Sequence, residues 1–158
     1  MKANIGINEE HSASTALILN TLLADEFVLY TKTKFYHWNV TGPSFNEYHL
    51  FFDTQAEELE DTIDEVAERA RSIGHFTIGT LSDFSKMTRL IEHSQGPLNK
   101  GLQLVQNLLD DHETLARTLR KDIGIVNDTN KDISTTDFLT GVLERHEKMA
   151  WMLRAYLG

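Results

Sequence analysis

Two histidines and the acidic residues that follow them are the part of this sequence best suited to chemistry. His37 and His49 lie in the segment FYHWNVTGPSFNEYHL, and carboxylates then recur at Asp53, Glu57, Glu60, Asp64 and Glu68. Steps of three and four residues return to the same face of an α-helix, so one long helix would carry these carboxylates along one arc. Imidazole and carboxylate together suit a borderline metal such as ferrous iron. The pattern therefore predicts a metal site on this helix.

Two helices are expected around this segment. Apolar residues at steps of three and four predict a first helix from Glu9 or His11 to about Tyr36. The residues of its apolar stripe are Leu17, Leu22, Leu23, Phe27 and Tyr30.

Turn-forming residues between His37 and Pro43 are expected to end the first helix. Ser44 is expected to cap a second helix, in a capping box with Glu47. This helix continues to about Ile73 and stops at Gly74.

The second half of the chain predicts two more long helices. A short helix is expected at Asp83–Glu92, and a third long helix from Pro97 to about Asp122, with an apolar stripe that includes Leu102. Residues 124–132, GIVNDTNKD, read as a polar turn. A fourth helix follows from Thr135 or Thr136 to Tyr156 or Leu157.

The lengths of the connections set the topology. The first and last are short, which makes those helix pairs antiparallel neighbours, whereas the middle one exceeds twenty residues. One long crossover in an all-α four-helix bundle is the ferritin-like arrangement. We expect a short N-terminal arm at residues 1–8 and one bundle domain at residues 9–158.

Composition narrows the classes of partner. The 158 residues carry a formal net charge of −9 and no cysteine, which excludes disulfides and thiolate metal sites. Neither end of the sequence has a lysine-rich tail, so tight binding to a DNA backbone is not expected. No signal peptide and no membrane-length apolar run is recognised, and the cytoplasm is the expected location.

A single chain cannot assemble the predicted site. No glutamate stands three residues before any histidine, which argues against the Glu-x-x-His site found inside some bundles. His49 and Asp64 are 15 residues apart, or about 22 Å along one helix. Two copies of the helix, antiparallel about a two-fold axis near residues 56–57, would bring His49 of one copy beside Asp64 of the other. His37 could reach the same place, and Glu68 lies one turn beyond Asp64.

The motif resembles that of the Dps family, the ferritin-like mini-ferritins. It reads His37-Trp38-Asn39, Gly42, Phe45, His49, Asp53, then Asp64-x-x-x-Glu68-Arg69. The resemblance implies a hollow homododecamer with a mono- or di-iron ferroxidase centre between subunits. His37 and His49 would come from one subunit, Asp64 and Glu68 from its two-fold mate, and Asp53 would lie near the metal.

The resemblance also implies a reaction. Fe(II) is oxidised, preferentially by hydrogen peroxide rather than oxygen, and Fe(III) is stored as a mineral, which protects DNA from oxidative damage. Trp38 would be an electron donor; the alternative is that it serves only in packing. Mineral would nucleate at Glu57, Glu60 and Asp61; the alternative is that these residues form a simple solvated helix face. An acidic pore would be lined by Asp122, Asp128, Asp132 and Asp137; the alternative is that they belong to a polar loop.

Two rival functions remain at this stage. The first is a nucleoid DNA-binding and compacting protein with secondary iron binding, the other activity of this family. The second is a structural or ligand-binding cage whose metal site is vestigial or holds zinc in place of iron. The remaining histidines are expected to be solvated or hydrogen-bonded: His11, His75, His93, His112 and His146.

Overall fold

The chain folds as an all-α bundle with one long crossover, as predicted. The computed structural model describes residues 3–93 and 101–158, and the regular elements within these ranges are all helices. They are α1 (Glu9–Asn39), α2 (Phe45–Ser72), α3 (Leu81–Met87), α4 (Gly101–Gly124), the π-helix η1 (Ile125–Thr129) and α5 (Ile133–Leu157).

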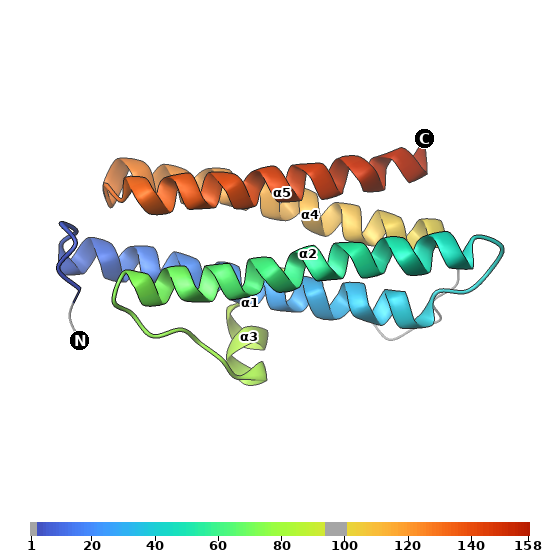
Figure 1. The fold of residues 1–158 in the computed structure, drawn as a ribbon, viewed down its shortest axis with the longest axis horizontal. Helices are drawn as coiled ribbons and strands as arrows, with labels where there is room; N and C mark the ends of the chain where they lie inside the picture. The colour runs from blue at the N-terminus through green and yellow to red at the C-terminus, as the bar shows by residue number, and fades with distance from the viewer. Residues whose placement is uncertain (1–2, 94–100) are drawn as a thin grey trace.

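Figure 1 shows how these helices pair. α1 and α2 lie side by side, as do α4 and α5, and the crossover that carries α3 leaves the end of α2 and runs along the outside of α1. The rings of Phe27 on α1 and Phe84 on α3 stack with centroids 4.3 Å apart. Residues 3–8 precede α1.

The first helix is longer than predicted. Asn8 caps its start, with the side-chain oxygen accepting from the backbone N–H of His11 at 2.8 Å. Its end lies at Asn39, with Val40 as the C-cap. His37 therefore belongs to the last turn of α1 and does not lie beyond it. The apolar stripe ends before the helix does. His37 and Asn39 continue the helix without adding apolar side chains to the stripe.

Ser44 precedes α2 as predicted, but it forms no side-chain capping bond and the expected capping box with Glu47 is absent there. Its backbone, at φ −102° and ψ 31°, is not in the extended region from which a side chain reaches back to the first N–H groups. At the other end, Gly74 takes a φ of +96°, which suits the predicted stop.

The second half contains three further differences from the prediction. The short helix α3 spans Leu81–Met87 rather than Asp83–Glu92, because Thr80 caps it and Thr88 already has extended backbone. The predicted start of the third helix at Pro97 lies outside the described residues. The predicted turn at 124–132 is largely helical, since η1 continues directly from α4.

Helix α5 starts at Ile133, two or three residues before the predicted start at Thr135 or Thr136. Asp132 is its N-cap and accepts a hydrogen bond from the backbone N–H of Thr135 at 3.0 Å. Lys131, with a φ of 57°, makes the turn between η1 and this cap. Thr135 and Thr136 instead lie in the first turn of the helix.

Two apolar clusters form the core. One surrounds Tyr36, Phe52 and Leu108, and the other surrounds Leu22 and Leu139. Two residues assigned to apolar stripes by periodicity are exposed instead, Leu17 and Leu102. By length and composition α1 could cross a membrane, although 61% of the relevant window is buried inside the bundle, as in a core helix.

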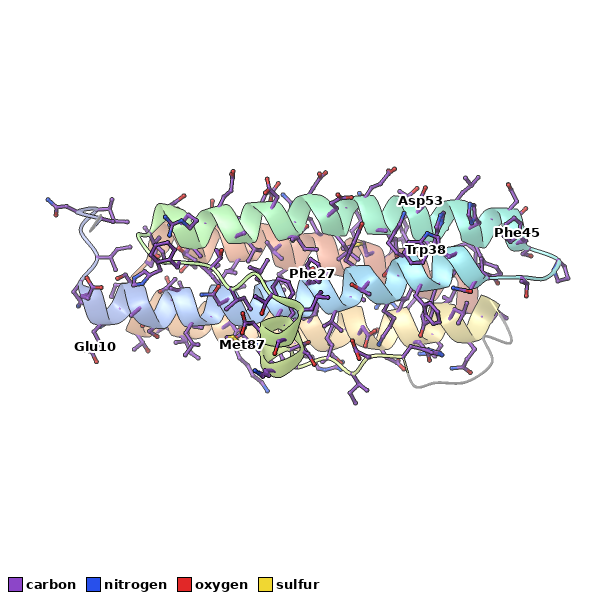
Figure 2. All side chains as sticks on the ribbon, turned by 90° about the horizontal axis from the view of Figure 1, so that it is seen from below. Glu10, Phe27, Trp38, Phe45, Asp53 and Met87 are labelled. Carbon is purple, nitrogen blue, oxygen red and sulfur yellow. The ribbon has the colours of Figure 1, made fainter. Side chains whose placement is uncertain are left out.

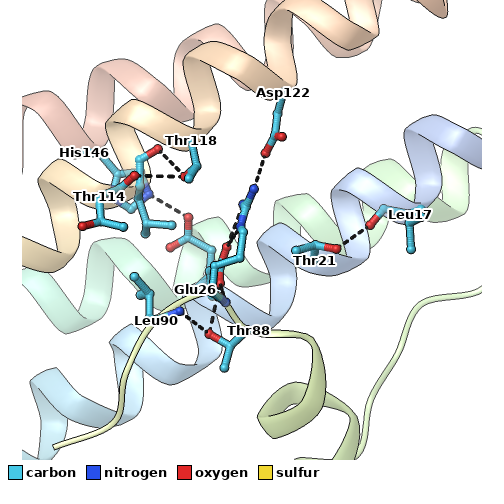
Figure 3. Close-up of polar contacts among 12 residues, drawn as sticks. Leu17, Thr21, Glu26, Thr88, Leu90, Thr114, Thr118, Asp122 and His146 are labelled. Atoms are coloured by element: carbon cyan, nitrogen blue, oxygen red, sulfur yellow. Dashed lines mark hydrogen bonds and ion pairs between the residues drawn. The ribbon is translucent and has the colours of Figure 1, made fainter.

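A polar layer separates the two clusters along the bundle. Glu26 on α1, His112 on α4 and His146 on α5 are fully buried. His146 Nε2 lies 2.7 Å from Glu26 Oε1, and the Nδ1 atoms of the two histidines are 2.9 Å apart. The contact between Glu26 and His146 is drawn in Figure 3. This layer fixes the register of three helices, because each group would otherwise lose its hydrogen-bond partner in a dry core.

An arginine fastens the crossover to the bundle. The Arg89 guanidinium donates to Asp25 Oδ2 through Nε at 2.8 Å and to Asp122 Oδ2 through Nη1 at 2.8 Å. Thr88 adds a hydroxyl bond to Asp25 Oδ1 at 3.0 Å. Figure 3 shows Thr88 and Asp122 on either side of this contact. The segment after α3 is thereby tied to both α1 and α4.

The buried histidine of α4 makes stability depend on pH. Burial, with a smaller contribution from His146, holds the pKa of His112 well below its ordinary value of 6.5. The unfolded chain therefore binds a proton near that value while the folded chain does not, so stability is lost as the pH falls below it. We expect the unfolding free energy to fall by up to about 1.4 kcal/mol per pH unit from this group.

Urea unfolding between about pH 8 and about pH 5, at fixed protein concentration, measures this slope. His112→Gln should flatten the pH dependence relative to the parent. His11→Gln, at the start of α1, should not. Equal slopes for the parent and His112→Gln would show that the buried ring does not control acid stability.

Candidate metal centre

The two histidines of the predicted site meet where α1 turns into α2. His37 lies in the last turn of α1 and His49 in the second turn of α2, and their rings stack with centroids 3.9 Å apart. Gly42, at φ +114°, makes the reversal between the helices, a backbone conformation that side chains disfavour. Phe45 stacks on the other side of His49 at 5.1 Å.

A pair of reciprocal hydrogen bonds orients both rings. His37 Nδ1 lies 2.8 Å from the backbone oxygen of His49, and His49 Nδ1 lies 2.9 Å from the backbone oxygen of His37. Because a carbonyl only accepts, each Nδ1 must carry its hydrogen and donate it. The Nε2 atom of each neutral ring is then left with a lone pair, the arrangement that prepares histidine to bind a metal.

Asp53 adds a carboxylate to this pair. Its Oδ1 lies 3.7 Å from His37 Nε2. That is too long for a hydrogen bond. Two atoms bound to one ion at about 2.0–2.2 Å each can be at most about 4.4 Å apart, so the separation suits shared ligation.

Lys34 is the partner of Asp53 in the single chain. Its Nζ donates to Asp53 Oδ1 at 2.7 Å. This hydrogen bond, with a smaller effect from His37, lowers the pKa of the Asp53 carboxyl below 3.8, against the opposing effect of burial. The carboxylate is therefore anionic at neutral pH and is held toward the histidine pair.

Trp38 follows His37 but faces outward. Its side chain is 67% exposed. Figure 2 shows Trp38, Asp53 and Phe45 at the same end of the bundle, near the α1–α2 turn. Within one chain Trp38 is thus not a packing residue of the core.

Asp64 and Glu68 lie farther along α2, and the structure does not bring them to the histidines. Both are exposed. The helix is continuous from Phe45 to Ser72, so His49 and Asp64 remain about 22 Å apart along its axis. Within the described residues of this one chain, no group of three or more His, Asp or Glu side chains is placed to hold a metal ion.

The other acidic residues of α2 divide into two sets. Glu58 and Glu65 pair with α5, through Lys148 Nζ at 3.1 Å and Arg145 Nη1 at 2.7 Å. By contrast, the predicted nucleation residues and two of the predicted ligands have exposed side chains: Glu57, Glu60, Asp61, Asp64 and Glu68. Packing against α5 therefore uses one edge of α2 and leaves a carboxylate face open.

The predicted pore carboxylates do not share one environment. Asp122 is buried against Arg89, and Asp132 is 2% exposed, where it caps α5 and lies 3.4 Å from Arg69 Nη2. Asp128 and Asp137 are exposed. Of the four, these two present carboxylates to solvent.

Sequence reasoning missed two sets of residues. Lys34 carried a usable signal, because it precedes His37 by three residues and so lies on the same face of α1. The layer of Glu26, His112 and His146 had only a weak signal: each stands three or four residues from apolar residues on both sides, which predicts burial on a helix face but not which partners meet.

Comparison with known proteins points to one family. A family model described as a ferritin-like domain matches residues 16–158. A low temperature-induced protein of Nostoc sp. is 40% identical over 156 residues, covering 99% of this chain and 87% of the relative. DNA protection during starvation protein 2 of Bacillus anthracis is 34% identical over 141 residues, covering 89% and 94%.

A solved structure gives the same result. The Dps protein of Vibrio cholerae O1, described as a member of a superfamily of ferritin-like diiron-carboxylate proteins, superimposes with a TM-score of 0.91. It is 30% identical, and the match covers 100% of this chain and 98% of that one.

Replacing His49 by alanine removes one Nε2 lone pair. It also removes the Nδ1 donor that bonds to the backbone oxygen of His37. We expect the affinity of the assembled protein for Zn²⁺, a redox-inert probe, to fall by at least about tenfold. Calorimetric titration measures it, with Thr54→Ala, an exposed change on the same helix, as the control. An unchanged affinity in His49→Ala would remove the histidine pair from the site.

Proposed function

This chain belongs to the Dps family of ferritin-like proteins, and from that membership and the geometry of the histidine pair we propose that it is a ferroxidase that stores iron. Its substrate is Fe(II), its oxidant is preferentially hydrogen peroxide, with oxygen as the alternative, and its product is an Fe(III) mineral. The single observation that carries the proposal is the reciprocal Nδ1 bonding of His37 and His49, which leaves each Nε2 available to a metal, with the Asp53 carboxylate 3.7 Å from His37 Nε2.

The donor set suits the oxidation of iron. Imidazole nitrogen binds ferrous iron well, whereas carboxylate oxygen favours the harder ferric ion. A site that combines His37 and His49 with Asp53, Asp64 and Glu68 would therefore hold the substrate and favour its oxidised form. One or two iron ions occupy each site in this proposal, and zinc can take their place.

The proposed site is completed by a second subunit. A two-fold axis near residues 56–57 would place the exposed carboxylates of one α2 beside the histidine pair of the other. The open face of α2 supports this, because Asp64 and Glu68 are not used by packing within the chain. We extend the assembly to a cytoplasmic homododecamer, with Glu57, Glu60 and Asp61 as nucleation residues and Asp128 at an iron-entry pore.

Trp38 is assigned a secondary role as an electron donor beside the site. It adjoins His37 in the chain, and its indole is exposed rather than packed in the core. At an intersubunit site this side chain would face the space between the two copies.

A mixing experiment tests the division of the site between subunits. We expect His37→Ala/His49→Ala and Asp64→Ala/Glu68→Ala each to oxidise Fe(II) no faster than protein-free buffer. Co-assembled after dissociation, they form mixed dimers with one intact site and one dead site. Random pairing restores about one quarter of the parent's sites.

Stopped-flow absorbance after peroxide addition to anaerobically loaded protein measures the recovery. Thr54→Ala mixed with the histidine variant serves as the matched control, because this exposed residue of α2 lies outside both the proposed ligands and the proposed nucleation residues. Mixed assemblies that stay inactive, while each variant alone forms shells of the parent's mass, would contradict a site shared between subunits. Parent protein that oxidises iron no faster than buffer would overturn the ferroxidase proposal.

DNA binding is proposed to be weak. The Bacillus anthracis relative is named for DNA protection, but the net charge of −9 on this chain repels a polyanion. Plasmid retardation in a low-salt gel, with and without Fe(II), separates protection by binding from protection by removal of iron and peroxide. We expect no retardation in iron-free buffer. Firm binding there would favour the nucleoid-compacting alternative.

A further inference from the structure

Phe45 stacks on one of the two histidines of the candidate metal centre. It is the first residue of α2, and the centroid of its ring lies 5.1 Å from that of His49, with the two planes 29° apart. The two residues are four positions apart on one helix, the spacing at which side chains meet. Side chains of an α-helix also lean toward its N-terminus, so the imidazole of His49 leans back over the turn that carries Phe45. The contact is thus built into α2 itself.

The stack gives His49 a ring on each face. His37 covers one face, at 3.9 Å between centroids and 21° between planes, and Phe45 covers the other. His37 is itself buried, whereas His49 is half-buried. The imidazole of His49 therefore has less support from the rest of the bundle and depends more on the rings that cover it.

The reciprocal hydrogen bond does not by itself fix the plane of this imidazole. It holds one atom, His49 Nδ1, at 2.9 Å from the backbone oxygen of His37. The torsion that joins the ring to its Cβ atom has a broad energy profile, so rotation about it is soft. A bound metal needs the Nε2 lone pair to point at it within about 10–20°. Contacts on both faces supply this restraint, because they permit only a narrow range of ring planes.

The turn before α2 holds Phe45 in place. The backbone N–H of Phe45 donates to the carbonyl of Gly42 at 3.1 Å, and that of Tyr48 donates to the carbonyl of Ser44 at 3.1 Å. Ser44 adds no side-chain cap. The backbone of the turn therefore fixes where Phe45 starts the helix, and its ring is brought to His49 from a defined position.

We propose that Phe45 is a positioning residue of the metal centre, which holds the imidazole of His49 in the plane from which Nε2 binds a metal ion. This rests on the proposed function, which uses the histidine pair and gives no role to Phe45.

The exposed part of the ring has a place in the proposed two-fold assembly. Phe45 is 44% exposed in the single chain. It precedes His49 by four residues, just as Glu68 follows Asp64 by four. An axis that brings His49 beside Asp64 therefore brings Phe45 beside Glu68 of the other copy. The phenyl ring would then lie against the completed site rather than in solvent.

A purely structural role is the alternative. Apolar and aromatic pairs four residues apart stabilise a helix, so Phe45 could serve the start of α2 alone. Three substitutions separate the two roles. Phe45→Tyr keeps an aromatic ring, and Phe45→Leu keeps an apolar side chain that packs at the helix start but cannot stack. Phe45→Ala removes both.

Binding of Co²⁺ to the assembled protein measures the positioning role, because the visible absorption of this ion changes with the number and arrangement of its ligands. We expect Phe45→Ala and Phe45→Leu each to lower the affinity about tenfold, the lower end for loss of a partner that orients a ligand histidine, and to alter the spectrum. Phe45→Tyr should keep the parent's affinity and spectrum. Parent-like binding by Phe45→Ala or Phe45→Leu, in assemblies of the parent's mass and helical content, would refute the positioning role.

The matched control is Leu50→Ala. Leu50 is an exposed apolar residue that follows His49 directly and is not one of the stacked rings. Its replacement removes apolar surface from the same turn of α2 and should leave the affinity for Co²⁺ unchanged. A loss as large as that of Phe45→Ala would trace the effect to apolar surface rather than ring orientation, and would overturn the proposal.

A second arm needs no metal. Crystal structures of the metal-free parent and of Phe45→Ala compare the imidazole directly. We expect the His49 ring of the variant to turn, so that its Nδ1 lies more than about 3.5 Å from the backbone oxygen of His37. An unmoved ring would contradict the proposal. A parent that oxidises no iron, or that binds no Co²⁺, would count against the proposed function alone, because this arm reports on the ring independently.

Discussion

The length of helix α2 is the constraint on which the candidate site depends. His49 and Asp64 lie on one continuous helix from Phe45 to Ser72, and a rise of 1.5 Å per residue separates them by about 22 Å. Ligands of one ion lie within a few ångströms of each other. A straight helix therefore cannot bring its own two half-sites together, and the site that we propose needs a second copy to supply the missing half. The fold is compatible with such pairing, because one edge of α2 packs on α5 and the other carboxylates stay exposed.

The two halves of the site are held in different ways. The histidine half is fixed within the chain, because each ring donates to the other residue's carbonyl and the α1–α2 turn closes tightly at Gly42. The carboxylate half, Asp64 and Glu68, is not held in this way and lies exposed at the surface of the chain. The buried polar layer and the Arg89 contact lie deeper and hold α1 in register with α4 and α5. The nitrogen ligands are thus already positioned within the single chain.

Periodicity and spacing predicted the helices and the long crossover and allowed His37 to reach the same place as His49, while the resemblance implied that both histidines serve one site. Helix ends were less predictable, because they depend on backbone angles that composition does not specify. Ser44 has a capping side chain but the wrong backbone, and residues 125–129 of the predicted turn continue the chain as a π-helix. The Lys34–Asp53 and Glu26–His146 contacts join residues 19 and 120 positions apart. Such contacts follow from packing, which a local pattern does not encode. The pairing of subunits remains a prediction from helix geometry.

Native mass spectrometry of zinc-loaded protein, under conditions that partly dissociate the assembly, tests the central claim most directly. Each ion's chain number and zinc content are read from the same mass. The account predicts zinc on dimers and larger species, up to two sites per dimer, and none retained by monomers that keep their helical fold. Monomers that carry zinc at the same ratio per chain as the assembly would show that one chain completes the site, and would contradict the account.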